Sequence, residues 1–229
     1  MFDGQFGESQ LAANVMPMKR KKGRGEYRMA KIPLSYKVWQ YQWGIDRLEQ
    51  AFTSSIAQIE VEQDQASANY TAYIKSGEDD SEYEYDGEDR FLIKSTEFEL
   101  QHDLFEIGQS TKVIREAFIV AAYHYWEKFA RNFTEEWTFP KLKKSYPYQT
   151  HEKLATLNKL SNNFKHIINY KRMKEVHRNW REIFSVAPHE IEVNGRIRYH
   201  WMLDVRNDHV LEVFQIVRAS GPVETGPLS

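Results

Sequence analysis

The chain has 229 residues, and its 31 Lys and Arg residues nearly balance its 33 Asp and Glu residues, so the overall charge does not single out nucleic acid as a partner. The absence of cysteine excludes disulfides and thiolate metal sites and favours a reducing, cytoplasmic compartment. Apolar residues make up 41% of the chain, enough for a sizeable core, but no apolar run reaches the ~20 residues that cross a bilayer, and the N-terminus lacks the apolar segment of a signal peptide.

Residues 1–31 are predicted to form a flexible basic tail, because they hold few large apolar residues. Five cations cluster there: Lys19, Arg20, Lys21, Lys22 and Arg24. A solvated leader explains such a run, and an arm that attracts phosphate is the alternative. Residues 221–229 are expected to form a second flexible tail, which leaves residues 32–220 as one helical domain.

Two long helices are predicted from apolar residues that recur at steps of three and four. The first runs from about residue 35 to about residue 74 and carries the stripe Val38, Tyr41, Ile45, Leu48, Phe52, Ile56 and Ile59. The second ends near Asn132 and carries the stripe Leu100, Leu104, Ile107, Thr111, Ile114, Phe118, Ala121, Tyr125 and Phe129. The acidic residues 77–89 would repel one another in a core, so we expect a solvated loop between the two helices.

The rest of the chain is predicted to comprise a loop over 138–149, helices over 150–170 and 171–184, a β-hairpin over 190–203 and a helix over 207–219. The hairpin is indicated by apolar residues that alternate on both sides of Asn194-Gly195, a dipeptide that suits a tight turn. The fold class is therefore all-α, an antiparallel bundle of four to five helices with a small C-terminal β-hairpin.

One face of the predicted helix over 150–170 carries side chains that could do chemistry. Its buried stripe is expected to consist of Leu154, Leu157, Ser161, Phe164 and Ile168. Lys159, Asn162 and His166 fall outside that stripe, so a cation, an amide and an imidazole share a non-core face. A solvated polar face is the ordinary explanation for such a set.

The segment Ser161-Asn162-Asn163-Phe164-Lys165-His166 resembles the motif of the HEPN superfamily, helical-bundle proteins found in many toxins and phage-defence ribonucleases. That motif is Arg, four to six residues, then His, and a common version reads Arg-Asn-x-x-Lys-His. The segment matches at Asn162, Lys165 and His166, whereas Ser161 stands at the Arg position. The helical layout over about 35–185 and an aromatic-rich second helix that reaches Glu127 are also similar to the family.

The resemblance implies an RNA-targeting protein, and in its sharper form a metal-independent endoribonuclease of a phage-defence or toxin system. His166 would transfer the proton, Asn162 would orient the reacting groups, and Lys159 would supply the cation beside the phosphate. Arg131, followed by Asn132, is an alternative cation. No metal or cofactor is needed, and a homodimer or a partner protein of the same system is implied. The alternative, favoured by Ser161, is a catalytically inactive helical module that binds a partner protein or RNA.

A basic cluster follows the motif and is a candidate RNA-binding surface, with Tyr170 and Trp180 available for stacking. Its members are Lys165, Lys171, Arg172, Lys174, Arg178 and Arg181. The alternative is that these charges balance the acidic residues 77–89 within the fold. Arg172 and His177 also show the spacing of the HEPN motif, whereas His124 and Glu127, one turn apart, are interpreted as packing residues.

Overall fold

The computed structural model describes residues 34–86, 89–166, 169–185, 192–193, 196–197 and 199–222, all within the unit Pro33–Ser229. These residues are mainly helical, with two small two-stranded antiparallel sheets, which confirms the predicted all-α class with a C-terminal hairpin. The predicted tail over 1–31 lies outside the described residues. Gly221 and Pro222, assigned to the second tail, are instead buried, and Gly221 lies so close to the ring of Tyr41 that an added Cβ would collide with it.

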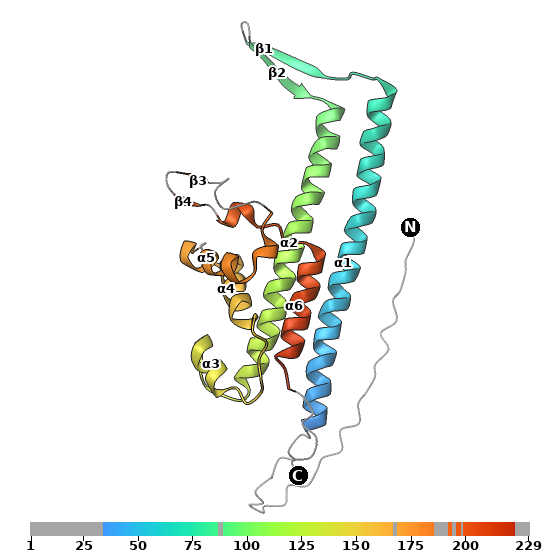
Figure 1. Cartoon of the computed structure of the whole chain (residues 1–229). Helices are drawn as coiled ribbons and strands as arrows, with labels where there is room; N and C mark the ends of the chain where they lie inside the picture. The colour runs from blue at the N-terminus through green and yellow to red at the C-terminus, as the bar shows by residue number, and fades with distance from the viewer. Residues whose placement is uncertain are drawn as a thin grey trace, which may run out of the picture. The chain divides into compact units, whose positions relative to one another are not determined.

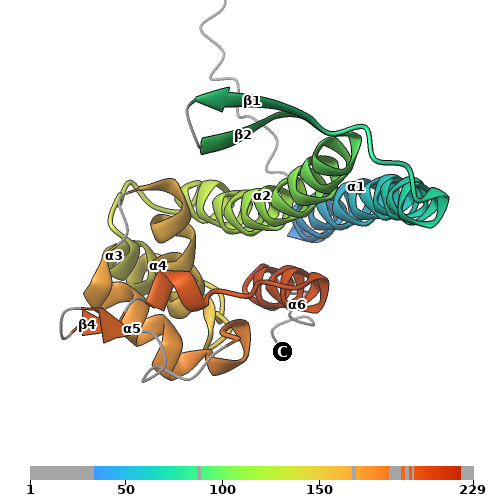
Figure 2. The ribbon, with the colours of Figure 1, turned by 90° about the horizontal axis from the view of Figure 1, so that it is seen from above.

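Helices α1 (Leu34–Ser76) and α2 (Thr96–Arg131) form the long antiparallel pair that the apolar stripes predict. The side chain of Ser95 caps α2 by accepting the Phe98 N–H, and Asn132 closes the helix at its predicted end. Helix α6 (Asn207–Ala219) has the predicted bounds and packs against both long helices (Figure 2). None of the described helices has a stretch that is long and apolar enough to cross a bilayer.

Three shorter helices follow α2, namely α3 (Phe139–Ser145), α4 (Leu154–Lys165) and α5 (Tyr170–Asn179) (Figure 1). Of these, α4 packs against α2, and α5 packs against α4. The loop predicted over 138–149 was wrong, because Pro140 occupies the first turn of α3, where a missing N–H costs nothing.

The helix predicted over 150–170 was too long. The Asn163 side chain accepts the Asn169 N–H at 2.9 Å, which turns the chain after Lys165 and starts α5. The helix predicted over 171–184 also ends early, at Asn179, and a short 3-10 turn, η1 (Arg181–Ile183), follows.

The acidic segment between the long helices is not the loop that its charge predicted. Strands β1 (Glu82–Asp86) and β2 (Asp89–Lys94) pair there as an antiparallel hairpin. The reason is an alternation of carboxylates with Tyr83 and Tyr85, which suits a strand with one face in water.

The predicted C-terminal hairpin is present in a shorter form. Strands β3 (Glu192–Val193) and β4 (Arg196–Ile197) pair in the expected antiparallel register. The predicted turn Asn194-Gly195 lies outside the described residues. The extension of the hairpin to residue 203 was wrong, because a 3-10 helix, η3 (Tyr199–Met202), takes its place.

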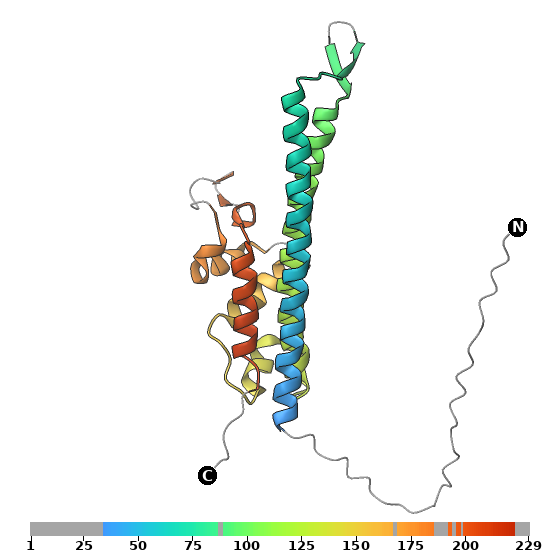
Figure 3. The same cartoon turned by 90° about the vertical axis from the view of Figure 1, so that its right-hand side faces the viewer.

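The core lies where α6 meets the lower halves of α1 and α2 (Figure 3), and it continues into buried residues of α4 and α5. Two buried side chains tie α6 to the long helices by hydrogen bonds. The Tyr41 hydroxyl on α1 donates to the Val217 carbonyl at 2.8 Å, and the Trp126 indole on α2 donates to the Ser220 carbonyl at 2.9 Å. Burial raises the pKa of the Tyr41 hydroxyl well above its ordinary value, so this group stays protonated and keeps donating.

Tyr41→Phe is expected to lower the free energy of unfolding by about 0.5–1.5 kcal/mol, because it removes a buried hydrogen bond to the Val217 carbonyl, which keeps the Ser220 N–H as its other donor. Urea denaturation followed by circular dichroism measures this change. The matched control is Tyr36→Phe, which removes the hydroxyl of an exposed tyrosine on the same helix and should change stability by less than about 0.5 kcal/mol. Equal losses in the two variants would contradict the role given to the buried hydroxyl.

Candidate nucleic-acid interface

The predicted face of Lys159, Asn162 and His166 does not converge on one point. His166 is the C-cap of α4, with an extended backbone and an exposed side chain, and its N–H donates to the Asn162 carbonyl at 3.2 Å. Because His166 lies beyond the last helical residue, helical spacing no longer aligns it with Lys159. Among the described residues, no hydrogen bond or ion pair holds the imidazole of His166.

The other two members of that face are engaged elsewhere. Lys159 forms an ion pair with Glu175 of α5, and the hydrogen bond from Lys159 lowers the pKa of the Glu175 carboxyl. The Asn162 amide donates to the Asn158 side chain at 2.8 Å. Ser161, at the position of the family's Arg, is fully buried as its place in the apolar stripe predicts. Lys159 therefore joins α4 to α5 rather than facing His166.

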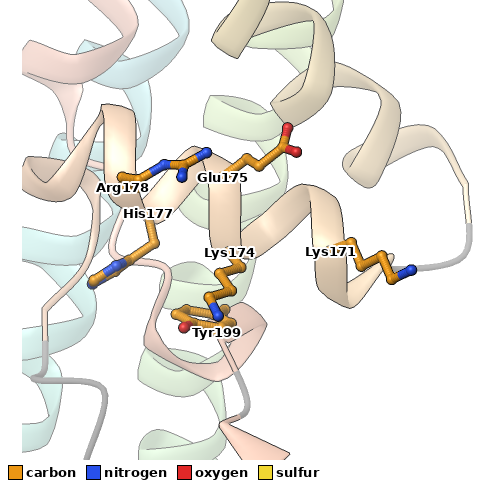
Figure 4. Close-up of a pocket in the computed structure, with 6 residues that line it drawn as sticks. All are labelled: Lys171, Lys174, Glu175, His177, Arg178 and Tyr199. Carbon is orange, nitrogen blue, oxygen red and sulfur yellow. The ribbon is translucent and has the colours of Figure 1, made fainter.

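Three residues of the predicted basic cluster, Lys171, Lys174 and Arg178, line a hollow of about 350 Å³ on α5 and η3 (Figure 4). Its lining consists of Lys171, Lys174, Glu175, His177, Arg178 and Tyr199. The Lys174 side chain points toward the ring of Tyr199, and Lys171 extends from the first turn of the helix (Figure 4). Within the described part of the chain, neither lysine has a carboxylate in ion-pair range, so both charges are open to an anion.

The other members of the basic cluster and its two aromatic residues differ in how freely they could contact RNA. Arg172 is exposed, whereas Arg181 donates to the Phe184 carbonyl at 2.6 Å. Trp180 cannot stack on a base as expected, because it is only 1% exposed and its indole donates to Glu212. Tyr170 remains exposed, and its ring centroid lies 5.5 Å from that of the buried Tyr199, so Tyr170 supplies the accessible aromatic surface beside the hollow.

His177, whose spacing from Arg172 also fits the HEPN motif, is packed against other aromatic side chains. Its ring lies 4.9 Å from Phe184 and 5.2 Å from Tyr199, between centroids. Burial, with a further contribution from the nearby Arg181, lowers the pKa of His177 and keeps the ring neutral. This histidine forms one wall of the hollow.

A second hollow, of about 510 Å³, lies where the C-terminal ends of α2 and α4 meet. We call it the α2–α4 cleft, and its lining consists of His124, Glu127, Lys128, Arg131, Asn132 and Lys165. It includes two of the predicted residues, Lys165 and the alternative cation Arg131. The helix α2 and its C-cap Asn132 carry all of the lining except Lys165, which α4 supplies across the interface between the two helices.

Four side chains of the α2–α4 cleft form a continuous chain of polar contacts. Lys165 Nζ lies 2.9 Å from His124 Nε2, and His124 Nδ1 lies 3.1 Å from Glu127 Oε2. Arg131 Nη2 donates to Glu127 Oε1 at 3.0 Å, and the Arg131 guanidinium lies over the ring of Trp137. The carboxylate can only accept and the ammonium can only donate, so His124 carries its proton on Nδ1 and accepts at Nε2.

This arrangement can bind an anion and move a proton in the same place. A carboxylate that holds one imidazole nitrogen fixes the ring and leaves the other nitrogen as a base. Arg131, Lys128 and Lys165 provide the positive charge that a phosphate requires. The side chain of His124 is about half exposed, which keeps it accessible to a ligand.

Sequence reasoning missed His124, which was assigned to packing. The available signal was a His, a Glu three residues later and an Arg four residues after that, which places all three on one helical face. Lys165, 41 residues further along the chain, could not be assigned to the same site from spacing alone. Among the described residues, no group of three or more His, Asp or Glu side chains is arranged to hold a metal ion.

Comparison with protein-family models, with curated proteins and with solved structures finds no significant match for this chain. The HEPN resemblance therefore rests on the residues quoted above and on the helical layout.

His124 is expected to occupy the Nδ1–H tautomer when neutral, because Glu127 accepts from Nδ1. Long-range ¹H–¹⁵N correlation spectra of the imidazole distinguish the two tautomers. Glu127→Ala with Lys165→Ala should remove this preference and give a mixture, whereas the tautomer of His102, an exposed residue of α2 with a carboxylate oxygen of Glu106 3.8 Å away, should not change. An Nε2–H tautomer for His124 in the unaltered chain would refute the arrangement.

Proposed function

We propose that this chain is a HEPN-like RNA-targeting protein that cleaves RNA without a metal, in a phage-defence or toxin system as the resemblance implies. The α2–α4 cleft would be its active site, with His124 rather than His166 as the proton-transfer group. The observation that carries the proposal is the chain of contacts from Lys165 through His124 and Glu127 to Arg131, which combines cations with an oriented imidazole.

The reaction suited to these groups is attack by a ribose 2′-hydroxyl on the adjacent phosphate. His124 Nε2 takes the proton of the 2′-hydroxyl as the new P–O bond forms. Arg131 and Lys165 stabilise the negative charge that develops on the phosphate oxygens. The bond to the 5′-oxygen then breaks, water supplies the proton to that leaving oxygen, and a cyclic 2′,3′-phosphate remains.

The hollow on α5 would serve as a binding track rather than as a second active site. Lys171 and Lys174 offer charge to the backbone, and the exposed Tyr170 offers a ring to a base. Single-stranded RNA suits such a surface, because its bases are free to stack and its backbone can follow an irregular line of cations.

His124→Ala is expected to reduce RNA cleavage by roughly 10²–10⁴-fold, the usual contribution of a general base. The measurement is single-turnover cleavage of a fluorescent single-stranded RNA in EDTA, with excess protein. His102→Ala, an exposed histidine of the same helix, and His166→Ala, the histidine of the motif, are the matched controls and should retain full activity.

The controls also separate the competing assignments. Loss of cleavage in His166→Ala alone would transfer the catalytic role to the motif histidine. Absence of cleavage in all four proteins, including the unaltered chain, would reject the enzyme and leave the inactive interaction module as the function.

Lys171→Ala with Lys174→Ala is expected to weaken RNA binding most at low salt. The logarithm of the RNA association constant falls linearly with the logarithm of salt concentration, and each phosphate contact removed should make that slope less steep by about 0.7. Fluorescence anisotropy over a range of NaCl concentrations measures that slope, with Lys75→Ala on α1 as the control for a lysine far from the hollow in sequence. An unchanged slope in the double variant would exclude the α5 hollow from the RNA path.

A further inference from the structure

The outer half of the long helical pair, which we call the arm (residues 60–114), lacks a core of its own. The last buried residue of α1 is Ile59 and the first of α2 is Ile119. Among the described residues between them, Ser95 alone is buried, and it is polar. Helix α6 covers the other half of the pair, and β1 and β2 lie at the far end (Figures 1 and 3). Two helices without a third layer leave apolar surface in water.

That exposed apolar surface is organised as a stripe on α2. Phe98, Phe105 and Val113 are 59%, 63% and 62% exposed, and their spacings of seven and eight residues place them on one helical face. With a rise of 1.5 Å per residue, the stripe extends for about 22 Å. The half-buried Leu100, Leu104 and Ile107 occupy the other side of the helix. A partner helix of about four turns would match the stripe in length.

The charge of the arm indicates the chemistry of its partner. Residues 60–114 contain 15 Asp and Glu against four Lys and Arg, although the whole chain is nearly neutral. Glu99, Asp103 and Glu106 flank the stripe on α2 and are exposed, and within the described residues no Lys or Arg pairs with them. A second copy of the arm would bring like charges together, and RNA would be repelled for the same reason.

We propose that the arm is a docking surface for a basic amphipathic helix of a partner protein. The partner helix would insert apolar side chains along Phe98, Phe105 and Val113 and would set Lys or Arg against the flanking carboxylates. This proposal does not depend on the function of the α2–α4 cleft, because the two surfaces share no residue.

The test uses the full chain and a fluorescein-labelled helical peptide of about 18 residues, with leucines at helical spacing and Lys and Arg on the flanks. A scrambled peptide of the same composition and a peptide with Glu in place of the cations are the controls. Anisotropy titrations should show binding of the basic amphipathic peptide, with affinity about tenfold or more above both controls.

Variants of the chain then locate the binding. Phe98→Ser with Phe105→Ser, and separately Glu99→Lys with Asp103→Lys, should each reduce the affinity about tenfold or more. Val61→Ser, at an exposed apolar residue of α1 in the arm, should retain it. All three variants alter exposed residues, and an unchanged Tm confirms that each remains folded.

Three results would overturn the proposal. The first is equal binding of the scrambled peptide, which would show simple charge attraction. The second is full affinity in the Phe98→Ser, Phe105→Ser variant. The third is a dimer in sedimentation that this variant dissociates, because a second copy would then cover the stripe. RNA cleavage should be unaltered in every arm variant, so failure of the docking surface and failure of the active site are distinguishable.

Discussion

The attachment of α6 and Ser220 to the long helices is the contact on which the rest of the structure depends. Tyr41 and Trp126 reach across the core from different helices to bind the carbonyls of Val217 and Ser220. The Ser220 hydroxyl also accepts the His151 N–H at 2.9 Å, just before α4 begins. A single segment thus closes the core and fixes the start of α4. Since α4 delivers Lys165 to His124, the geometry of the cleft follows from packing at the opposite end of that helix.

Charge is distributed along the molecule rather than balanced within each part. The arm carries an excess of carboxylates, whereas α5 and the α2–α4 cleft present cations. The alternative that residues 77–89 neutralise the basic cluster would need contact between them, but β1 and β2 lie beyond one end of the long helices and α5 lies beside their middle (Figure 1). An anionic polymer would be attracted to one region and repelled from the other, so the proposed RNA and the proposed basic helix would occupy different regions of the fold.

Periodicity predicted the parts of the fold that depend on one apolar face. The bounds of α1 and α6 and the C-terminal end of α2 were predicted within about two residues, because each helix buries a continuous stripe in the same core. Elements that depend on local chemistry were missed. The strand β1 was missed because its carboxylates predicted a solvated loop. The early end of α4 is determined by the side chain of Asn163. The candidate site was therefore also predicted wrongly, because a shared face of Lys159 and His166 requires a helix that continues past residue 165.

In the proposed mechanism, the contact between Lys165 and His124 would couple RNA binding to proton transfer. In the free protein the ammonium group occupies Nε2, the nitrogen that would act as a base. A phosphate group entering the cleft competes for Lys165, because a charged oxygen is a stronger acceptor than a neutral imidazole. Withdrawal of Lys165 would then expose Nε2 while Glu127 continues to hold the ring through Nδ1. The base would therefore become available only when the anion is in place, which needs no movement of the backbone and no second protein.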